Sequence, residues 1–436
     1  MTPHELPPQT TKAAPKTGYA VVRSTAKATT TMMAKGAKKP AAPPGRRAAG
    51  SARPSSRPAR ATSRCASGTA QGVQSSGRAP ARNPAAHPVD PAVSGFVSRS
   101  GAGLVLAGRP FRFTGVNMYQ GLSDFPVNIG CGTTINDLDS AFAALRPGSV
   151  VRVWGTQFQA INRNTWTLDW APFDRFINAA TAHQVKLVMT LGEQAGVCDD
   201  GHWKDQDWYR GGYHQAFDDA HRGASPYSYW DWLHLVVPRY ATNPTIAFWE
   251  PLNEPQTSNC NPGFQGEGCY GHGYCPDGNA ELLRDWLTTI GTEIHRLAPR
   301  QLVSSGTIGN GECGAWQQYY AMMASSPGVD VLTVHDYDPS PLNPTMAQHI
   351  DQARDAGKPI VWEEVGTDAT PPGGNGCAKN VSDRADLFTT KIRTLFAHPE
   401  VAGFLAWNWI EQRGNGCDLE IGPHDPLITT LNTALG

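Results

Sequence analysis

Two glutamates, each within a short motif, carry the carboxyl groups that cleavage of a glycosidic bond requires. Glu254 lies in the segment WEPLNEP (residues 249–255), and Glu364 lies in WEEVG (362–366). Hydrolysis of a glycosidic bond uses a protonated carboxyl that assists the departing oxygen and an ionised carboxylate that attacks the sugar or activates water. A retaining mechanism places the two groups about 5 Å apart. The sequence therefore predicts a glycoside hydrolase, provided that its fold brings the two motifs together.

The elements that carry these motifs are predicted to be strands of a (β/α)8 barrel. From about residue 95, short β-branched runs alternate with amphipathic stretches, which is typical of βα units around a parallel sheet. Eight strands, the number at which such a sheet closes, are predicted over residues 111–119, 149–154, 185–191, 246–253, 301–305, 329–335, 359–364 and 401–409. A hairpin over 96–107, turning at 108–110, should precede them, with helices that include 172–183, 280–297 and a closing one at 425–435.

A doubly wound open sheet is the alternative architecture. It would need a glycine-rich phosphate turn after the first strand, and the segment GVNM (115–118) does not supply GxGxxG. Loops of about 35 residues (192–226) and about 25 residues (255–279) follow the third and fourth predicted strands, against a usual length of about 2–6. Both loops leave the C-terminal ends of strands, where barrel enzymes build their active sites.

Polar residues mark the C-terminal ends of four predicted strands. The second strand ends in RVW (152–154), the fourth in WEPLNEP (249–255), the sixth in HDY (335–337) and the seventh in EEVG (363–366). The interior below these ends should be packed with Val, Ile and Leu. The polar ends therefore predict one site at the mouth of the barrel, with the two glutamates facing each other.

These motifs resemble glycoside hydrolase family 5, the cellulase and β-mannanase family of retaining (β/α)8-barrel enzymes. The stretch from YATNP (240–244) to the NEP at 253–255 resembles that family's fourth strand, and KPIVWEEVG (358–366) resembles its nucleophile strand. The likeness covers residues 105–436. The resemblance implies that Glu254 is the general acid/base and Glu364 the nucleophile, because the family's attacking glutamate stands two residues before Gly366.

The resemblance also implies roles for the neighbouring residues. Glu363 would point away from the site, and Arg152 would keep Glu364 ionised and oriented through charge-assisted hydrogen bonds. Asn253 would bind the sugar 2-hydroxyl, in a contact that strengthens in the transition state.

Three aromatic or imidazole side chains complete the implied site. Tyr337 would donate to the nucleophile, and His335 would line the site. Trp407 would form a platform under the reacting sugar, because CH-rich sugar faces pack on aromatic rings. Trp409 shares the face of Trp407 on the predicted strand and is the alternative platform.

Three further residues enter as substrate-binding or supporting residues. Asn117 in GVNMY (115–119) and Trp154 in RVW (152–154) lie in strands that resemble mannanases more than bacterial endocellulases. Glu193 stands near the end of the third predicted strand, where the family usually has Asn or His, and would be a substrate contact of this subtype.

Aromatic side chains are frequent in the loop over 192–226 and just after it. They could line sugar subsites or anchor the loop, and the sequence leaves both open: Trp203, Trp208, Tyr209, Tyr213, Tyr227, Tyr229 and Trp230. In the same loop His214, Asp218 and His221 would share a helical face, which we interpret as a hydrated surface and not as a metal site.

Composition divides the chain into a basic tail over 1–92 and a catalytic domain over 93–436. Residues 1–90 contain fifteen Lys and Arg against Glu5 and Asp90, a net charge of +13, which leaves −14 for the rest of the chain. The tail is rich in Ala, Pro, Arg and Ser, so it cannot bury enough apolar surface to offset chain entropy and is predicted to be disordered. The acidic remainder argues against a nucleic-acid partner.

Eight of the nine cysteines lie in the acidic part, mostly in predicted loops, which favours disulfides and an extracellular location. Their connectivity is open beyond a predicted long-range pair of Cys377 with Cys417 and a local pair within 260–275. Residues 1–90 lack the apolar run of a signal peptide, so the export route is unexplained. No stretch approaches the roughly 20 apolar residues of a membrane span.

The sequence therefore predicts a monomeric, extracellular enzyme that cleaves β-linked glycans by double displacement without a metal or other cofactor. β-Mannan is the favoured substrate and β-glucan the next. An exo-acting β-glycosidase of the same family and a non-catalytic carbohydrate-binding barrel are the alternatives. Paired carboxylates argue against the binding protein, because binding alone has no use for them.

Overall fold

The fold is a closed barrel of eight parallel strands. A computed structural model describes residues 91–216, 226–260 and 273–435. The barrel strands are, in chain order, β4 (Phe113–Asn117), β5 (Val150–Trp154), β6 (Lys186–Thr190), β7 (Ile246–Glu250), β10 (Leu302–Val303), β11 (Leu332–Asp336), β12 (Ile360–Val365) and β13 (Val401–Ala406). Their spatial order is β10-β7-β6-β5-β4-β13-β12-β11. A parallel bridge between Ser304 and Val331 joins the two end strands, so the sheet closes on itself.

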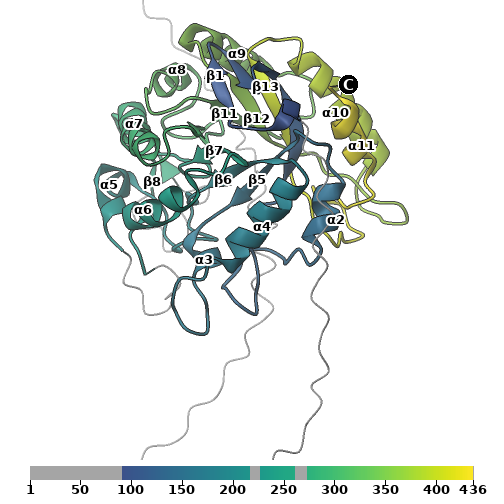
Figure 1. The fold of residues 1–436 in the computed structure, drawn as a ribbon. Helices are drawn as coiled ribbons and strands as arrows, with labels where there is room; N and C mark the ends of the chain where they lie inside the picture. Colours follow the sequence, from purple (N-terminus) through teal and green to yellow (C-terminus); the bar gives the residue numbers. More distant parts are fainter. Residues whose placement is uncertain (1–90, 217–225, 261–272, 436) are drawn as a thin grey trace, which may run out of the picture. The chain divides into compact units, whose positions relative to one another are not determined.

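Helices follow the strands and form the outer layer of the barrel (Figure 1). They are α2 (Leu138–Ala143), α3 (Gln157–Ala160), α4 (Ala171–Ala182), α5 (Gln206–Arg210), α6 (Tyr229–Tyr240), α7 (Asn279–Leu297), α8 (Gln318–Ala324), α9 (Pro344–Ala356), α10 (Val381–Leu395) and α11 (Pro426–Thr433), with 3-10 turns η1 (Pro91–Val93) and η2 (Gly212–His214). The predicted (β/α)8 barrel is confirmed.

The two-residue period of a strand decides which side chains enter the barrel. In β5, Val151 and Val153 pack outward in the core under the helices, whereas Val150 and Arg152 face inward. The lower, inward layer is apolar and includes Val150, Val188 and Phe248. The strands β5, β6 and β7 are buried on both faces, as expected for a parallel sheet.

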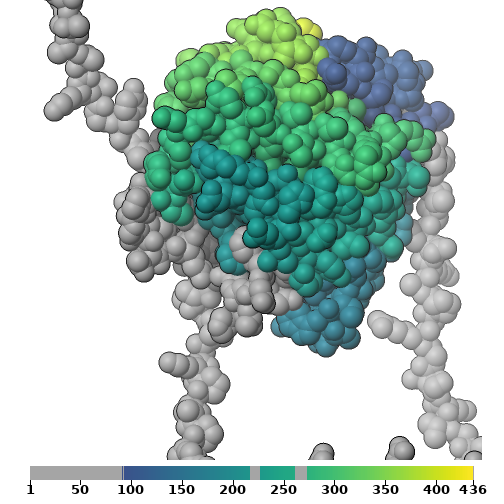
Figure 2. All heavy atoms as spheres, turned by 90° about the vertical axis from the view of Figure 1, so that its left-hand side faces the viewer, coloured from purple at the N-terminus to yellow at the C-terminus, as the bar shows by residue number. Residues whose placement is uncertain are grey.

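A small antiparallel sheet precedes the barrel and packs against its apolar interior. It consists of β1 (Ser98–Ser100), β2 (Gly103–Leu106) and β3 (Arg109–Phe111). Leu104, Leu106 and Phe111 join the inward-facing strand residues in one apolar cluster. Arg99 donates to the Gly357 carbonyl just before β12, which places the sheet at the N-terminal ends of the strands. Figure 2 shows this blue segment at the surface beside green residues.

The N-terminal hairpin differs in detail from the prediction. It has three strands, and its second turn is at Ala107-Gly108, both with positive φ (50° and 75°), so Arg109 and Pro110 already belong to β3. Two consecutive positive φ values fit the tight turns that match the twist of a hairpin. The first barrel strand consequently begins at Phe113 and not at Phe111.

A second two-stranded ribbon lies in the loop after β7, formed by β8 (Asn259–Cys260) and β9 (Gly273–Tyr274). The residues between these strands, 261–272, lie outside the described ranges, as do 1–90 and 217–225. The predictions of a disordered tail and of a surface face containing Asp218 and His221 fall there. Within the described residues, none of the helices has the length and apolar character needed to cross a bilayer.

Among the described residues, three disulfides join loops that follow barrel strands. Cys131–Cys198 links the loops after β4 and β6, Cys275–Cys313 those after β7 and β10, and Cys377–Cys417 those after β12 and β13. The predicted Cys377–Cys417 pair is confirmed. Cys260 is also disulfide-bonded, but Cys275 does not belong to a local pair within 260–275 because its partner is Cys313. All three bonds brace the C-terminal side of the barrel.

Candidate active site

Glu254 follows β7 in a strained backbone conformation that its neighbours impose. Its φ is +54°, a left-handed value that is uncommon for a residue with a side chain. Its N–H donates to the Gly306 carbonyl at 2.9 Å. Gly306 must be glycine, since a Cβ there would lie 2.1 Å from the Leu252 carbonyl oxygen. Strain that the surroundings fix in this way is typical of functional sites.

A β-bulge in β12 places Glu364 inside the barrel. Val334 and His335 of β11 pair with Trp362 and Glu364, and Trp362 and Val365 pair with residues of β13 that are two apart. The strand β12 therefore carries one extra residue on both sides, between Trp362 and Val365. Because Trp362 and Val365 both pack in the outer core, the two glutamates between them turn inward together.

This bulge contradicts the prediction that Glu363 points away from the site. Simple alternation would send Glu363 and Glu364 to opposite faces. Instead the Glu363 carboxylate is 1% exposed, and its Oε2 lies 3.8 Å from Arg152 Nε and 3.9 Å from His335 Nε2.

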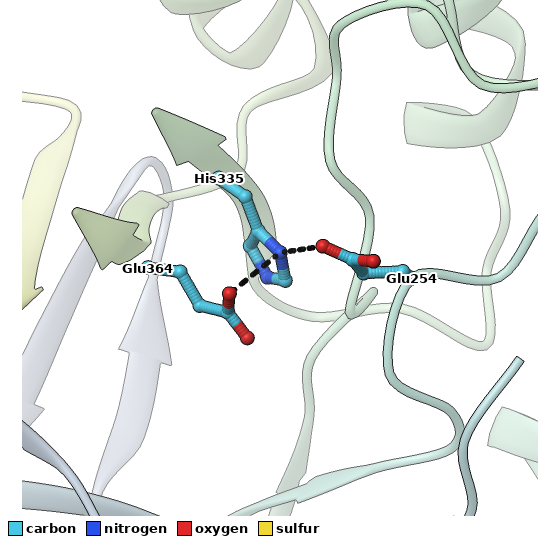
Figure 3. Close-up of side chains that lie close together, drawn as sticks. All are labelled: Glu254, His335 and Glu364. Carbon is cyan, nitrogen blue, oxygen red and sulfur yellow. Dashed lines mark hydrogen bonds and ion pairs between the residues drawn. The ribbon is translucent and has the colours of Figure 1, made fainter. Parts of the chain in front are cut away.

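The catalytic candidates Glu254 and Glu364 face each other across His335. One carboxylate oxygen from each glutamate and a ring nitrogen of His335 all lie within 4.8 Å of one another. His335 Nδ1 is 2.9 Å from Glu254 Oε1 and 3.5 Å from Glu364 Oε2 (Figure 3). This separation is close to that of retaining glycosidases, about 5–5.5 Å, and shorter than the inverting range of about 6.5–9.5 Å.

Arg152 lies below the glutamates and holds the site together. Its Nη1 donates to Glu364 Oε1 at 2.5 Å and to Asn117 Oδ1 at 3.1 Å. Its Nη2 donates to Glu250 Oε1 at 2.6 Å and to Asn253 Oδ1 at 2.5 Å. The guanidinium is fully buried, and its pKa is raised because the attraction of Glu250 and Glu364 outweighs the cost of burial.

Tyr337 holds the other oxygen of Glu364. Its hydroxyl donates to Glu364 Oε2 at 2.6 Å. The ring packs against Gly366, where a Cβ would lie 2.5 Å from Tyr337 Cε1. The glycine that ends the nucleophile motif is thus needed for the close approach of the tyrosine. Both oxygens of Glu364 are therefore fixed by donors.

The two facing glutamates have different electrostatic surroundings. Burial raises the pKa of Glu254 to about 7, with a small further rise from Glu250 and an opposing effect of Arg152. Burial also raises the pKa of Glu364, but His335, Arg152 and the Tyr337 hydrogen bond all oppose that rise. Burial lowers the pKa of His335 to about 4, so its imidazole is neutral at pH 7. The site can hold one protonated and one ionised glutamate near neutral pH.

Trp407 and Trp154 form an aromatic group with Tyr119 at the strand ends. Trp407 stacks on Tyr119 with ring centroids 5.2 Å apart and an interplanar angle of 12°, and Trp154 lies 5.2 Å from the Tyr119 ring. The Cys131–Cys198 disulfide packs against this group. Trp407 is partly exposed, whereas Trp409 is buried. Of the two, Trp407 is the one that can present a face to a ligand.

The loop aromatics serve mainly to anchor the loop after β6. Trp208, Tyr209, Tyr213 and Tyr229 are buried, and three of them pack directly on Trp286 of α7. Trp203, Tyr227 and Trp230 are partly exposed. Of the two roles that the sequence left open, the four buried rings therefore anchor the loop and do not line sugar subsites.

Glu193 is buried within the same loop. Its Oε2 accepts from Val197 N at 2.9 Å, and burial raises its pKa to about 7 against the opposing effects of that bond and of Lys204. Lys204 itself is buried and pairs with Asp199 at 3.3 Å and Asp200 at 2.5 Å. Glu193 therefore organises the loop, and its contact with substrate remains a prediction.

Asn117 and Asn253 support the site through Arg152. Asn117 donates from Nδ2 to the Glu363 carbonyl at 2.9 Å and is fully buried, which makes it a structural support. Asn253 uses its carbonyl oxygen for Arg152, which leaves its amide nitrogen for other partners.

Residues of α10 and α11 also line a groove. These two helices lie on the outside of the barrel (Figure 1). The lining of the groove includes Asp386, Arg393 and Thr430. None of the residues described above as site residues takes part in it, so it does not compete with the barrel mouth as a candidate active site.

Comparisons with known proteins connect this geometry to a family. No protein-family model matches the chain. The probable mannan endo-1,4-beta-mannosidase C of Aspergillus terreus is 29% identical over 324 residues, covering 62% of this chain and 73% of that protein. The mannan endo-1,4-beta-mannosidase A of Hypocrea jecorina is 24% identical over 387 residues, covering 78% and 76%.

Solved structures show the same fold. An endo-1,4-beta-mannanase from Rhizomucor miehei superposes with a TM-score of 0.54 at 19% identity, covering 78% of this chain and 98% of that one. A glycoside hydrolase family 5 mannosidase from the same organism gives 0.52 at 14% identity, covering 78% and 96%. These relatives and the shared fold support the resemblance to glycoside hydrolase family 5. The glutamates, the arginine and the other polar motif residues that the resemblance implied lie together in one site.

The role of Glu250 was not predicted from the sequence, and the predicted orientation of Glu363 is wrong. Glu250 accepts from Arg152 and from Thr190 Oγ1 at 2.9 Å, inside the barrel. A signal was present, because Phe248 and Glu250 share one strand face and a buried carboxylate requires a partner. The bulge that turns Glu363 inward leaves no comparable mark in the sequence.

Replacing Glu254 with Gln should remove a pH-dependent loss of stability. A carboxyl whose pKa is raised to about 7 in the folded state stabilises the fold fully below its ordinary value, and this contribution is lost as the pH rises through 7. The free energy of unfolding in urea should therefore favour the variant increasingly between about pH 5 and pH 8. Glu193 and Glu312 titrate in both proteins, and because the Glu254 charge helps to raise their pKa values, its removal acts in the same direction. An equal difference at both pH values would contradict the raised pKa.

Proposed function

We propose that the chain is a family 5 hydrolase and cleaves β-1,4-linked mannan by double displacement, with Glu254 as general acid/base and Glu364 as nucleophile. The approach of their carboxylates to within 4.8 Å carries the proposal. At this separation no water fits between the attacking group and the sugar, so the carboxylate itself attacks.

In the first step Glu364 attacks the anomeric carbon of the sugar. A carbon–oxygen bond forms to Glu364 while the glycosidic carbon–oxygen bond breaks, and Glu254 donates its proton to the departing oxygen. Arg152 and Tyr337 hold the two Glu364 oxygens, which directs the attack. The pKa of about 7 keeps a large fraction of Glu254 protonated near neutral pH, as this step requires.

In the second step Glu254 acts as a base. It takes a proton from water, whose oxygen attacks the anomeric carbon and releases Glu364 with its bonding electrons. Formation of the ester removes the negative charge of Glu364, one of the charges that disfavour ionisation of Glu254. The pKa of Glu254 consequently falls when a base is needed. The anomeric carbon is inverted twice, so the product retains its β configuration.

The substrate contacts follow from the groups that remain free. The Asn253 amide nitrogen donates to the sugar 2-hydroxyl, and the open face of Trp407 supports the sugar ring. These roles are supported by position alone.

Mannan is favoured because both relatives reported above are named as mannan endo-1,4-beta-mannosidases. The same names support endo cleavage over the exo alternative. β-Glucan is the second candidate substrate. The three loop disulfides support an extracellular location, and we further propose a monomer whose catalytic domain spans residues 93–436.

Activity on β-mannan should depend on both glutamates. Glu254→Gln should lower kcat about 10²–10⁴-fold on mannan, the usual contribution of general acid catalysis, with a smaller loss on aryl β-mannosides whose leaving group needs little protonation. Glu364→Gln should inactivate the enzyme on both substrates. Glu281→Gln, exposed on α7, is the matched control.

The measurement is product sizing on mannan, glucomannan and carboxymethylcellulose. A ladder of β-mannan oligosaccharides is the expected result, whereas monosaccharide alone would indicate an exo enzyme. Full turnover in either active-site variant would refute the catalytic assignment, and sugar binding without hydrolysis by the unmodified protein would favour the binding-protein alternative.

A chelator should leave this activity unchanged. Glu254, His335 and Glu364 are close enough to bind a metal ion, but double displacement needs Glu364 as a free nucleophile. Its Oε1 is already bonded to the Arg152 cation, which would repel a metal. Incubation with EDTA followed by the mannan assay tests this expectation, and a loss restored by a divalent cation would count against it.

A further inference from the structure

Two carboxyl groups lie deeper in the barrel than the catalytic pair. Glu250, on β7, is fully buried, and Glu363, on the bulge of β12, is 1% exposed. Both lie near Arg152 Nε, whereas Glu364 accepts from Nη1. Neither can touch substrate, so any effect on the reaction must act through Arg152 or His335.

Glu250 is well supplied with donors. Its Oε1 accepts from Arg152 Nη2 at 2.6 Å, from Arg152 Nε at 3.2 Å and from Thr190 Oγ1 at 2.9 Å. Its Oε2 lies 3.3 Å from Arg152 Nε. Burial alone would raise the pKa of Glu250, but the attraction of Arg152 is stronger and lowers it. Glu250 is therefore the ionised partner of the guanidinium.

Glu363 has no such supply. Its Oε2 is buried without a hydrogen-bond donor, and the nearest polar nitrogens are 3.8 Å (Arg152 Nε) and 3.9 Å (His335 Nε2) away. An unpaired buried carboxylate is costly, whereas a protonated carboxyl can donate. Glu363 and Glu250 lie against the same nitrogen, because their Oε2 atoms are 3.8 Å and 3.3 Å from Arg152 Nε. Burial and the charge of Glu250 together raise the pKa of Glu363 well above its usual range.

We propose that Glu250 and Glu363 are a positioning pair that holds one proton, donated by Glu363 to Glu250, and that their single negative charge fixes Arg152 for its contact with Glu364. This proposal rests on the function proposed above. One cation then faces two anions, Glu250 and Glu364, and its charge is divided between them. An ionised Glu363 would add a third anion and draw Arg152 Nε away from Glu250. The other titratable groups that face the pair are Glu254, His335, Tyr229 and Tyr320.

Neutral substitutions at these two positions distinguish a positioning role from a purely structural packing role. Glu363→Gln keeps a donor toward Glu250, so kcat should stay within about threefold and the acid limb of the kcat/KM profile should not move. Glu250→Gln removes the charge that competes for Arg152. Glu363, 3.8 Å from Arg152, would take up that charge once Glu250 no longer opposes its ionisation, so the test combines Glu250→Gln with Glu363→Gln. In this double variant Arg152 stabilises ionised Glu364 more strongly, so the acid limb should shift down by about one pH unit and kcat should fall about 10–100-fold with little change in KM.

Glu312→Gln is the matched control. Glu312 is buried and its pKa is raised to about 7, chiefly by burial, but it accepts from the Gly309 and Asn310 N–H groups and not from Arg152. Its replacement should leave the acid limb in place. A shifted acid limb in Glu363→Gln, or an unchanged one in the folded double variant, would overturn the proposal.

An infrared measurement tests the shared proton without any activity. At about pH 9 Glu254 is ionised, and the carbonyl stretch of a protonated carboxyl should persist in the unmodified protein and in Glu364→Gln but disappear in Glu363→Gln. A band that survives in Glu363→Gln would refute the assignment even if the double variant does not fold. A failed mannan assay with this band intact would instead count against the proposed function alone.

Discussion

The Arg152 guanidinium carries a permanent positive charge in a part of the barrel that water does not reach. Burying such a charge is expensive unless anions and acceptors surround it. The barrel supplies them from separate strands: Glu250 on β7, Asn117 on β4, and Glu364 on β12, with Asn253 from the loop after β7. Because one rigid fork joins these groups, the geometry of the catalytic glutamate is tied to that of the whole interior. The hydrogen bonds that make the burial of Arg152 possible therefore also orient Glu364.

The second constraint is the single extra residue in β12. Without the bulge, either Glu363 or Glu364 would face the helices, and the site would lose one of its carboxyl groups. With it, the catalytic glutamate stands at the mouth and its neighbour supports the layer below. Bulges next to active sites redirect side chains in this way. The left-handed backbone at Glu254 has the same effect on the opposite wall, where Gly306 leaves the space for it.

Much of this site could be predicted because most of its residues stand at the ends of predicted barrel strands. Residues at the C-terminal ends of parallel strands converge, so Arg152, Asn253, His335 and Tyr337 could be assigned to one site once the strands were recognised. The inward turn of Glu363 could not, since a bulge depends on pairing with both neighbouring strands and not on local sequence. The pairing of Cys275 with Cys313 was also beyond reach, because spacing along the chain does not report which long loops meet. The burial of Trp208 and Tyr209 depends on contact with α7, which the loop sequence does not encode.

The central claim is that Glu364, and not its neighbour, becomes covalently bound to the sugar. Incubation with an activated 2-deoxy-2-fluoro-β-mannoside, which slows the second step, followed by mass spectrometry of peptic fragments tests it directly. The account predicts one fluoromannosyl group per chain, attached to Glu364 in the peptide that contains residues 360–366, and no labelling of Glu364→Gln. Attachment to Glu363, or turnover of this substrate with inversion and no adduct, would contradict it.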